Sequence, residues 1–88
     1  MGWTFLTTHA LVLVEIASDP ELTMRSLAAR LGVSERTVQT LIRDLVAEGY
    51  LTRTRVGRRN TYRVHLDQQM RHPVVQRHKV EALLRALR

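Results

Sequence analysis

Residues 27–45 hold two runs of apolar side chains at helical spacing, separated by a very short connection, and this pattern constrains the fold more than any other. The connection is Gly32-Val33-Ser34. A residue just past a helix end often adopts a left-handed conformation, which glycine takes without steric cost. Ser34 suits the N-cap of the second helix, where its hydroxyl can accept from an otherwise unpaired backbone N–H. The sequence therefore predicts two helices joined by a tight corner.

The second helix of this pair is predicted to carry a polar outer face. Its apolar residues turn inward, and the side chains left outside are suited to base edges and phosphates. The residues that we expect to read the major groove of DNA are Arg36, Thr37, Gln39, Thr40 and Arg43. Glutamine can pair with adenine, and arginine with guanine, by two hydrogen bonds each. For this segment taken alone, an ordinary corner between two packed helices is the alternative.

A basic hairpin is predicted directly after the helix pair. Gly49 marks the end of the second helix, and strands are expected over residues 50–56 and 61–66 around a turn at residues 57–60. Apolar and polar residues alternate in the second strand up to Leu66, so one face can be buried while the other is polar. The predicted fold is therefore mainly α-helical with a small β-hairpin wing, a winged helix-turn-helix.

This order of motifs resembles compact winged helix-turn-helix transcriptional regulators of the MarR-like and ArsR-like kind, over about residues 7–66. The resemblance is carried by Leu27-Ala28, Leu31-Gly32-Val33-Ser34, Thr37-Val38, Leu41, Leu45, Gly49-Tyr50-Leu51, Gly57-Arg58 and Tyr62. It implies that residues 34–43 enter the major groove, and that residues 55–63 reach phosphates or the adjacent minor groove. It thus implies a sequence-specific regulator that binds double-stranded DNA, commonly as a homodimer built through terminal helices.

A second group of residues is expected to contact the DNA backbone. These residues are Arg25, Ser34, Arg55, Arg58, Arg59, Asn60 and Arg63. Many relatives place a glutamate three residues after the threonine that opens the supporting helix, whereas this chain has Ser26 after Thr23. Arg25 instead puts a positive charge in the first helical turn, which a nearby phosphate would stabilise. An exposed arginine without any DNA contact fits this position equally well.

The positive charge of the chain is concentrated on the predicted reading surface. The chain has 14 Lys and Arg against 8 Asp and Glu, for a formal net charge of +6. Residues 1–22 contain no lysine or arginine, whereas residues 23–63 contain nine arginines against three acidic residues. Only Lys79 is a lysine, and guanidinium groups bind phosphate and guanine by two parallel hydrogen bonds. The hairpin arginines favour nucleic acid as the partner, whereas Arg30 and Arg53 fit a solvated surface.

The segment before the helix pair is predicted to add one helix and one strand. The helix is expected over about residues 8–18, and Asp19-Pro20 ends it. Its predicted core face consists of Ala10, Leu11, Leu13, Val14 and Ala17. Residues 22–24 could contribute a short third strand to the sheet of the hairpin.

The chain divides into a predicted DNA-binding domain of residues 1–66 and a linker with a last helix at residues 67–88, a possible dimerisation element. This helix is expected over about residues 74–87, and its apolar stripe packs either on the domain or on a second copy. In a twofold dimer the two reading helices would recognise half-sites about 10 base pairs apart. The aromatic residues Trp3 and Phe5 are candidates for the same interface, or for packing within one chain.

Other classes of function are disfavoured by the sequence. The chain has no cysteine, its four histidines are not spaced as metal ligands, and its serines have no matching His/Asp arrangement. We therefore expect no metal, no cofactor and no enzyme activity, and the sequence identifies no small-molecule effector. Three alternatives stay open. They are a winged-helix protein-interaction module, which would need an apolar reading face, a non-specific nucleic-acid-binding protein, and a single-strand or RNA binder, which would need stacking aromatics.

The location of the protein is also predicted from the sequence. The apolar stretch of residues 10–17 is too short to span a bilayer and contains Glu15. No positively charged residue precedes this stretch, so we expect no signal peptide. The sequence thus predicts a cytoplasmic protein without membrane contact.

Overall fold

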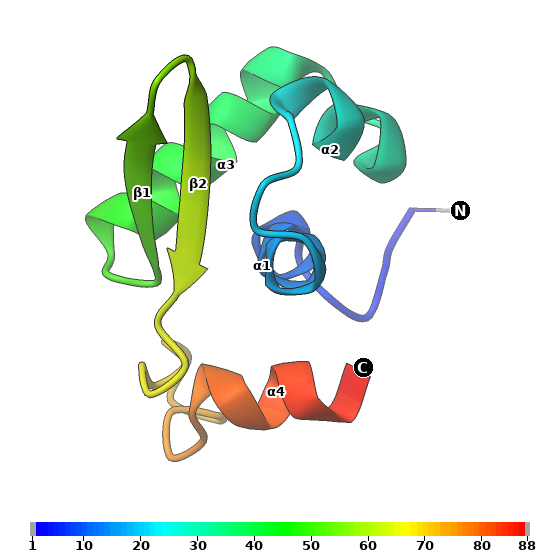
Figure 1. Cartoon of the computed structure of the whole chain (residues 1–88). Helices are drawn as coiled ribbons and strands as arrows, with labels where there is room; N and C mark the ends of the chain where they lie inside the picture. The colour runs from blue at the N-terminus through cyan, green and yellow to red at the C-terminus, as the bar shows by residue number, and fades with distance from the viewer. Residues whose placement is uncertain (1, 88) are drawn as a thin grey trace.

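The computed structural model describes residues 2–87, and over these residues the chain folds into helices followed by a hairpin and a last helix (Figure 1). The elements are α1 (Thr8–Ser18), α2 (Met24–Leu31), α3 (Glu35–Ala47), β1 (Leu51–Val56), β2 (Arg59–Val64) and α4 (Val80–Leu87). β1 and β2 pair antiparallel. Three helices followed by an antiparallel hairpin form the winged helix-turn-helix fold that the sequence predicts.

Helix α1 has the predicted bounds but buries a different face. Its N-cap is Thr7, whose side chain accepts a hydrogen bond from the backbone N–H of Ala10 over 3.2 Å. The side chains that it buries fully are Val12, Leu13 and Ile16. Of the predicted face only Leu13 is fully buried, whereas Ala17 is exposed. Because α1 is apolar on several sides, helical periodicity alone does not identify the side that meets the core.

The corner between α2 and α3 has the predicted geometry. The side chain of Thr23 caps α2 by accepting from the backbone N–H of Ser26 over 3.1 Å. Gly32 ends α2 with a φ of 70°, in the left-handed region. Ser34 then caps α3 by accepting from the backbone N–H of Thr37 over 3.0 Å. The three local signals of the sequence are therefore confirmed, and they fix the entry into α3.

The third strand predicted at residues 22–24 does not form. Met24 is the first residue of α2, and Thr23 is held as its cap, so neither residue is available to a sheet. The described sheet has two strands, β1 and β2. The chain just before this segment is bound to the hairpin by a backbone hydrogen bond of 3.1 Å, from Tyr62 N–H to the carbonyl of Pro20.

The hairpin is tighter than the sequence predicts. Val56 pairs with Arg59, which leaves Gly57 and Arg58 as the turn, and β2 begins at Arg59 rather than at Thr61. Gly57 has a φ of 63°, and a glycine with positive φ at the first turn position is typical of type II′ hairpin turns. This turn matches the natural twist of the two strands, so the wing is extended to its tip.

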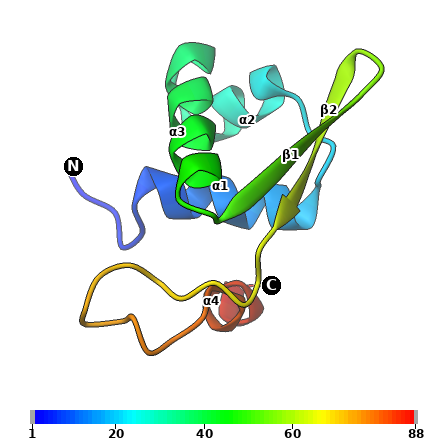
Figure 2. The same cartoon turned by 90° about the vertical axis from the view of Figure 1, so that its left-hand side faces the viewer.

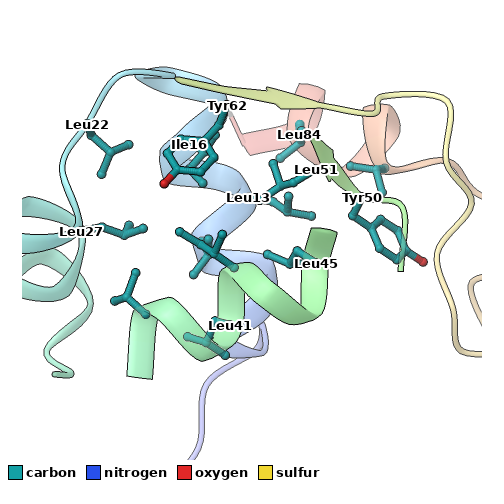
Figure 3. Close-up of a cluster of buried hydrophobic side chains, with 14 of the residues drawn as sticks. Leu13, Ile16, Leu22, Leu27, Leu41, Leu45, Tyr50, Leu51, Tyr62 and Leu84 are labelled. Atoms are coloured by element: carbon teal, nitrogen blue, oxygen red, sulfur yellow. The ribbon is translucent and has the colours of Figure 1, made fainter. Parts of the chain in front are cut away.

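The hydrophobic core lies between α1, α3 and the hairpin (Figure 3). Tyr62 is buried in the cluster, as the alternation in β2 predicts, whereas Leu66 is 45% exposed because β2 ends at Val64. Tyr50 buries its ring and directs its hydroxyl out of the cluster, where it donates to the carbonyl of Gln69 over 2.7 Å. This hydrogen bond holds the segment that follows β2 against the domain.

Helix α4 begins later than the sequence predicts. Residues 72–78 form turns, with hydrogen bonds of 2.9 Å from Val75 N–H to the carbonyl of His72 and from His78 N–H to the carbonyl of Val75. Gln69 and Lys79 then form an isolated antiparallel bridge directly before α4. The predicted start at residue 74 is therefore wrong, because the chain first returns to pair with the segment that follows β2.

The apolar stripe of α4 is turned to its own domain. Val80 and Leu84 are buried in the same core as α1, and α4 packs against α1. Figure 2 shows α4 and the hairpin turn at opposite ends of the molecule. Of the two predicted roles of this stripe, packing on the domain is the one that the fold shows for Val80 and Leu84.

Candidate nucleic-acid interface

The outer face of α3 is the first part of the candidate interface. Its five predicted reading residues are Arg36, Thr37, Gln39, Thr40 and Arg43, and all are exposed. The opposite face of α3 is fully buried at Val38, Leu41, Ile42 and Leu45. This burial holds the helix against the core, so its exposed side chains project from a rigid support.

Two of the five reading residues have hydroxyl groups that are already engaged. Ser34 Oγ donates to Thr37 Oγ1 over 3.0 Å, so the proton of the Thr37 hydroxyl remains available to an outside acceptor. Thr40 Oγ1 donates to the carbonyl of Arg36 over 3.2 Å, which leaves its oxygen as an acceptor. Thr37 can thus act as a donor and Thr40 as an acceptor toward DNA, and the longer side chains of α3 carry further donors for bases and phosphates.

The register of the hairpin sorts its predicted contact residues into two faces. Residues directly opposite each other share a face, and faces alternate along each strand. Arg55 and Asn60 lie on the face that continues from the core, and Arg59 and Arg63 lie on the outer face. Arg55 Nε donates to the carbonyl of Gly57 over 3.1 Å, which folds this side chain toward the turn. The hairpin arginines therefore form two groups on either side of the wing.

Arg53 belongs to the first of these groups, although sequence reasoning assigned it to the solvated surface. It lies directly opposite Tyr62, on the same face as Arg55. Burial raises the pKa of the Tyr62 hydroxyl, and the positive charge of Arg53 and a hydrogen bond with Asn60 offset part of this rise. The period of two along β1, counted from Arg55, is the signal that could have identified Arg53.

The tip of the wing lies beside the start of α2. A groove of about 180 Å³ between them is lined by residues 21–24 on one side and by Arg58, Arg59, Asn60 and Tyr62 on the other. Arg25 is exposed in the first turn of α2 but does not line this groove. The structure thus brings three of the predicted backbone-contact residues together, Arg58, Arg59 and Asn60, and it does not bring Arg25 into the same groove.

The ion pairs of residues 2–87 include neither the reading residues of α3 nor the arginines of the wing. Arg30 pairs with Glu15 over 2.9 Å, Arg85 with Glu81 over 3.0 Å, and Arg71 with Glu48 over 3.9 Å. His9 Nε2 lies 2.9 Å from Asp44 Oδ2. The hydrogen bond to Glu15, and then its charge, raise the pKa of Arg30. The expectation that Arg30 belongs to a solvated surface rather than to the DNA-facing cluster fits this exposed pairing. Among residues 2–87, the arginines of α3 and the wing keep their charge uncompensated by ion pairs, as a polyanion-binding surface requires.

Two further observations concern other kinds of site. Over the part of the chain that the structure describes, no three His, Cys, Asp or Glu side chains are grouped as metal ligands would be. In the same residues, no helix combines the length and the apolar character that crossing a membrane requires.

The capped reading helix, the glycine corner and the basic hairpin define the class of this protein as a winged helix-turn-helix protein of the DNA-binding kind. Comparison with known families then gives the particular family. The profile of the MarR family matches residues 4–59, which cover most of the chain, and the chain therefore belongs to the MarR family. No individual curated protein matches the chain. Membership of this family implies a DNA-binding transcriptional regulator without enzyme activity.

Proposed function

We propose that this protein is a sequence-specific regulator that binds double-stranded DNA as a homodimer, with α3 in the major groove and the wing on the backbone or the adjacent minor groove. The observation that carries the proposal is the exposed outer face of α3, whose arginines are not neutralised by acidic partners within the described chain. The start of α3 and the hairpin turn lie at the same end of the molecule (Figures 1 and 2), so one duplex can meet both.

The long polar side chains of α3 are the proposed base readers. Gln39 can pair with adenine, and Arg36 or Arg43 with guanine, each pair contributing about 1 to 3 kcal/mol of discrimination. Thr37 and Thr40 supplement them at closer range. Because an interaction module would need apolar side chains here, the polar face of α3 favours nucleic acid over a protein partner.

Backbone phosphates are the proposed ligands of the remaining residues. They are Ser34 and Arg25 at the helix starts, and Arg55, Arg58, Arg59, Asn60 and Arg63 on the wing. We add Arg53 to this set because it shares a face with Arg55. These contacts fix the register of the protein on the duplex without reading its sequence. The proposed function also places the protein in the cytoplasm, where its DNA lies.

The proposal is tested with single variants on a cognate duplex and on a scrambled duplex of the same length. Arg36→Ala and Gln39→Ala should each reduce the ratio of cognate to scrambled affinity by about 5- to 150-fold. Arg77→Ala is the matched control, because Arg77 is exposed in the turns before α4, away from α3 and the wing. Equal losses on both duplexes for the α3 variants would contradict base reading, and the absence of any duplex binding would point to a protein partner.

A further inference from the structure

The residues before α1 form an aromatic arm, defined here as residues 2–7, that its own domain does not cover. Trp3 is 68% exposed and Phe5 is 93% exposed. Their rings contact each other edge to face, with centroids 5.2 Å apart and planes at 82°. Aromatic side chains contribute most to stability when they are buried, so two neighbouring exposed rings indicate a surface that meets a partner.

An apolar groove lies close to the point where the arm joins α1. It has a volume of about 490 Å³ and runs between the start of α1, the end of α3 and the segment leading into α4. Its apolar lining includes Leu13, Leu45, Tyr50, Met70, Val80 and Leu83. The groove lies at the end of the domain that is distant from the hairpin turn (Figure 2), so an occupant would leave the reading surface open.

The distribution of charge favours the arm and the groove as the surface on which two copies associate. Each copy carries a net charge of +6, which opposes association elsewhere on the surface. The arm contains no ionisable side chain. The charged groups at the rim of the groove are paired, with His9 Nε2 lying 2.9 Å from Asp44 Oδ2 and Arg71 lying 3.9 Å from Glu48. An uncharged aromatic segment of a second copy therefore suits this rim.

The area is also sufficient for a dimer. A buried Trp or Phe removes roughly 150–250 Å² from water, so one arm contributes about 300–400 Å² with its two rings. The groove loses a smaller area, because Leu13, Leu45, Tyr50 and Val80 in its lining are already buried. A twofold dimer contains the contact twice, so the sum is about 1,000 Å², which is at the lower limit of specific protein interfaces.

We propose that the aromatic arm of one copy inserts Trp3 and Phe5 into the groove of a second copy, and that the second copy returns the same contact. This inference rests on the proposed homodimer and names the surface that forms it. It differs from the expectation based on the last helix, because Val80 and Leu84 are already used within one domain. The arm takes their place as the element that joins the copies.

The first test measures where the arm binds. The chain has no cysteine, so Thr4→Cys in the arm and Ala47→Cys at the exposed end of α3, on the groove, introduce unique thiols. Two differently tagged copies, one with each substitution, are mixed and treated with a short thiol crosslinker. Crosslinking between the two tags is expected, and the pair of Thr4→Cys with Val56→Cys on the distant wing should not react. No crosslink between tags, or crosslinking only within one chain of the doubly substituted protein, would overturn the proposal.

The second test measures the dissociation constant of the dimer by sedimentation in the absence of DNA. Trp3→Ser with Phe5→Ser should weaken dimerisation by at least about a hundredfold, because large aromatic anchors dominate such interfaces. Val56→Ser removes an exposed apolar side chain at the other end and should leave the constant unchanged. An unchanged dimer in the arm variant would overturn the proposal.

Failure of this inference is distinguishable from failure of the proposed function. The arm variant should retain binding to a duplex that holds one half-site, since α3 and the wing are intact in each copy. The arm variant could instead be folded and still a dimer but no longer bind a half-site duplex. The arm would then act in DNA binding and would not be a separate dimerisation element. A wild-type dimer that binds no duplex would contradict the proposed function and leave the arm contact standing.

Discussion

Ser34 and Thr37 are joined by two hydrogen bonds of 3.0 Å each, one from the Thr37 backbone N–H to Ser34 Oγ and one from Ser34 Oγ to Thr37 Oγ1. One hydroxyl thus stabilises the first turn of α3 and orients the hydroxyl that follows it. The start of the reading helix and two candidate DNA contacts, Ser34 itself and Thr37, therefore depend on the same side chain.

Substitution of Ser34 separates these two roles. Ser34→Ala should lower the free energy of unfolding by about 0.5–2 kcal/mol through loss of the cap, and should also weaken DNA binding. Ser34→Asp keeps a good cap but places a negative charge where a phosphate is expected, so stability should be retained while affinity falls. Urea unfolding and duplex titration measure the two effects. An aspartate variant with undiminished affinity would show that no phosphate approaches this position.

Gly32 is expected to be required for its backbone conformation alone. Its φ is 70°, and a Cβ placed there would meet no atom within 4 Å. Gly32→Ala should therefore lower the free energy of unfolding by about 1–2 kcal/mol, the cost of left-handed backbone for a residue with a Cβ. Gly32→Asn should cost less, since asparagine tolerates this conformation. Equal stability of the alanine variant and the wild type in urea would contradict this account of the corner.

Alkaline pH should destabilise the fold through its two tyrosines. Burial raises the pKa of Tyr50 and of Tyr62 above their ordinary value. Above about pH 10 the unfolded chain loses these protons first, so it binds fewer protons than the folded chain and stability falls as pH rises. The stabilising contribution is complete below pH 10 and is lost as the pH passes through the raised values.

Urea unfolding between about pH 9 and pH 11.5 measures this effect. Tyr62→Phe should flatten the decline, and few other groups interfere because the chain contains a single lysine. A decline of unchanged slope in a variant with both tyrosines replaced by phenylalanine would assign it to other groups.

The wing should contribute affinity without base preference. Each phosphate contact adds about 0.9 to the slope of log affinity against log salt, so Arg58→Ala with Arg59→Ala should reduce that slope by nearly 2. Affinity should fall alike on cognate and scrambled duplexes. Arg77→Ala again serves as the control, because it also removes one positive charge per substituted site. An equal slope for the wild type, the wing variant and this control would show that the wing turn does not contact the DNA.

The parts of the fold that the sequence predicts are those set by local chemistry. Thr23, Gly32 and Ser34 act within one helical turn of their own position, so their roles as caps and corner could be derived before any tertiary structure. The exposed face of α3 follows from the same reasoning, because a helix with a strong apolar stripe leaves its other side to solvent.

The errors concern features that depend on partners distant in sequence. The buried side of α1 is chosen by α3 and the hairpin, since its own residues are apolar on several sides. The late start of α4 depends on the bridge between Gln69 and Lys79. The division of the wing arginines between two faces depends on the register Arg55↔Asn60 and Val56↔Arg59, which the two-residue turn sets.

The function proposed for this MarR family protein depends on base reading by α3 in a dimer. The most direct test is selection of bound fragments from a random duplex pool at physiological salt, followed by sequencing. We expect enrichment of an inverted repeat whose half-sites are about 10 base pairs apart, or a multiple of that spacing. Salt-sensitive binding without any enriched sequence would contradict the proposed function, because the phosphate contacts alone would then account for the binding.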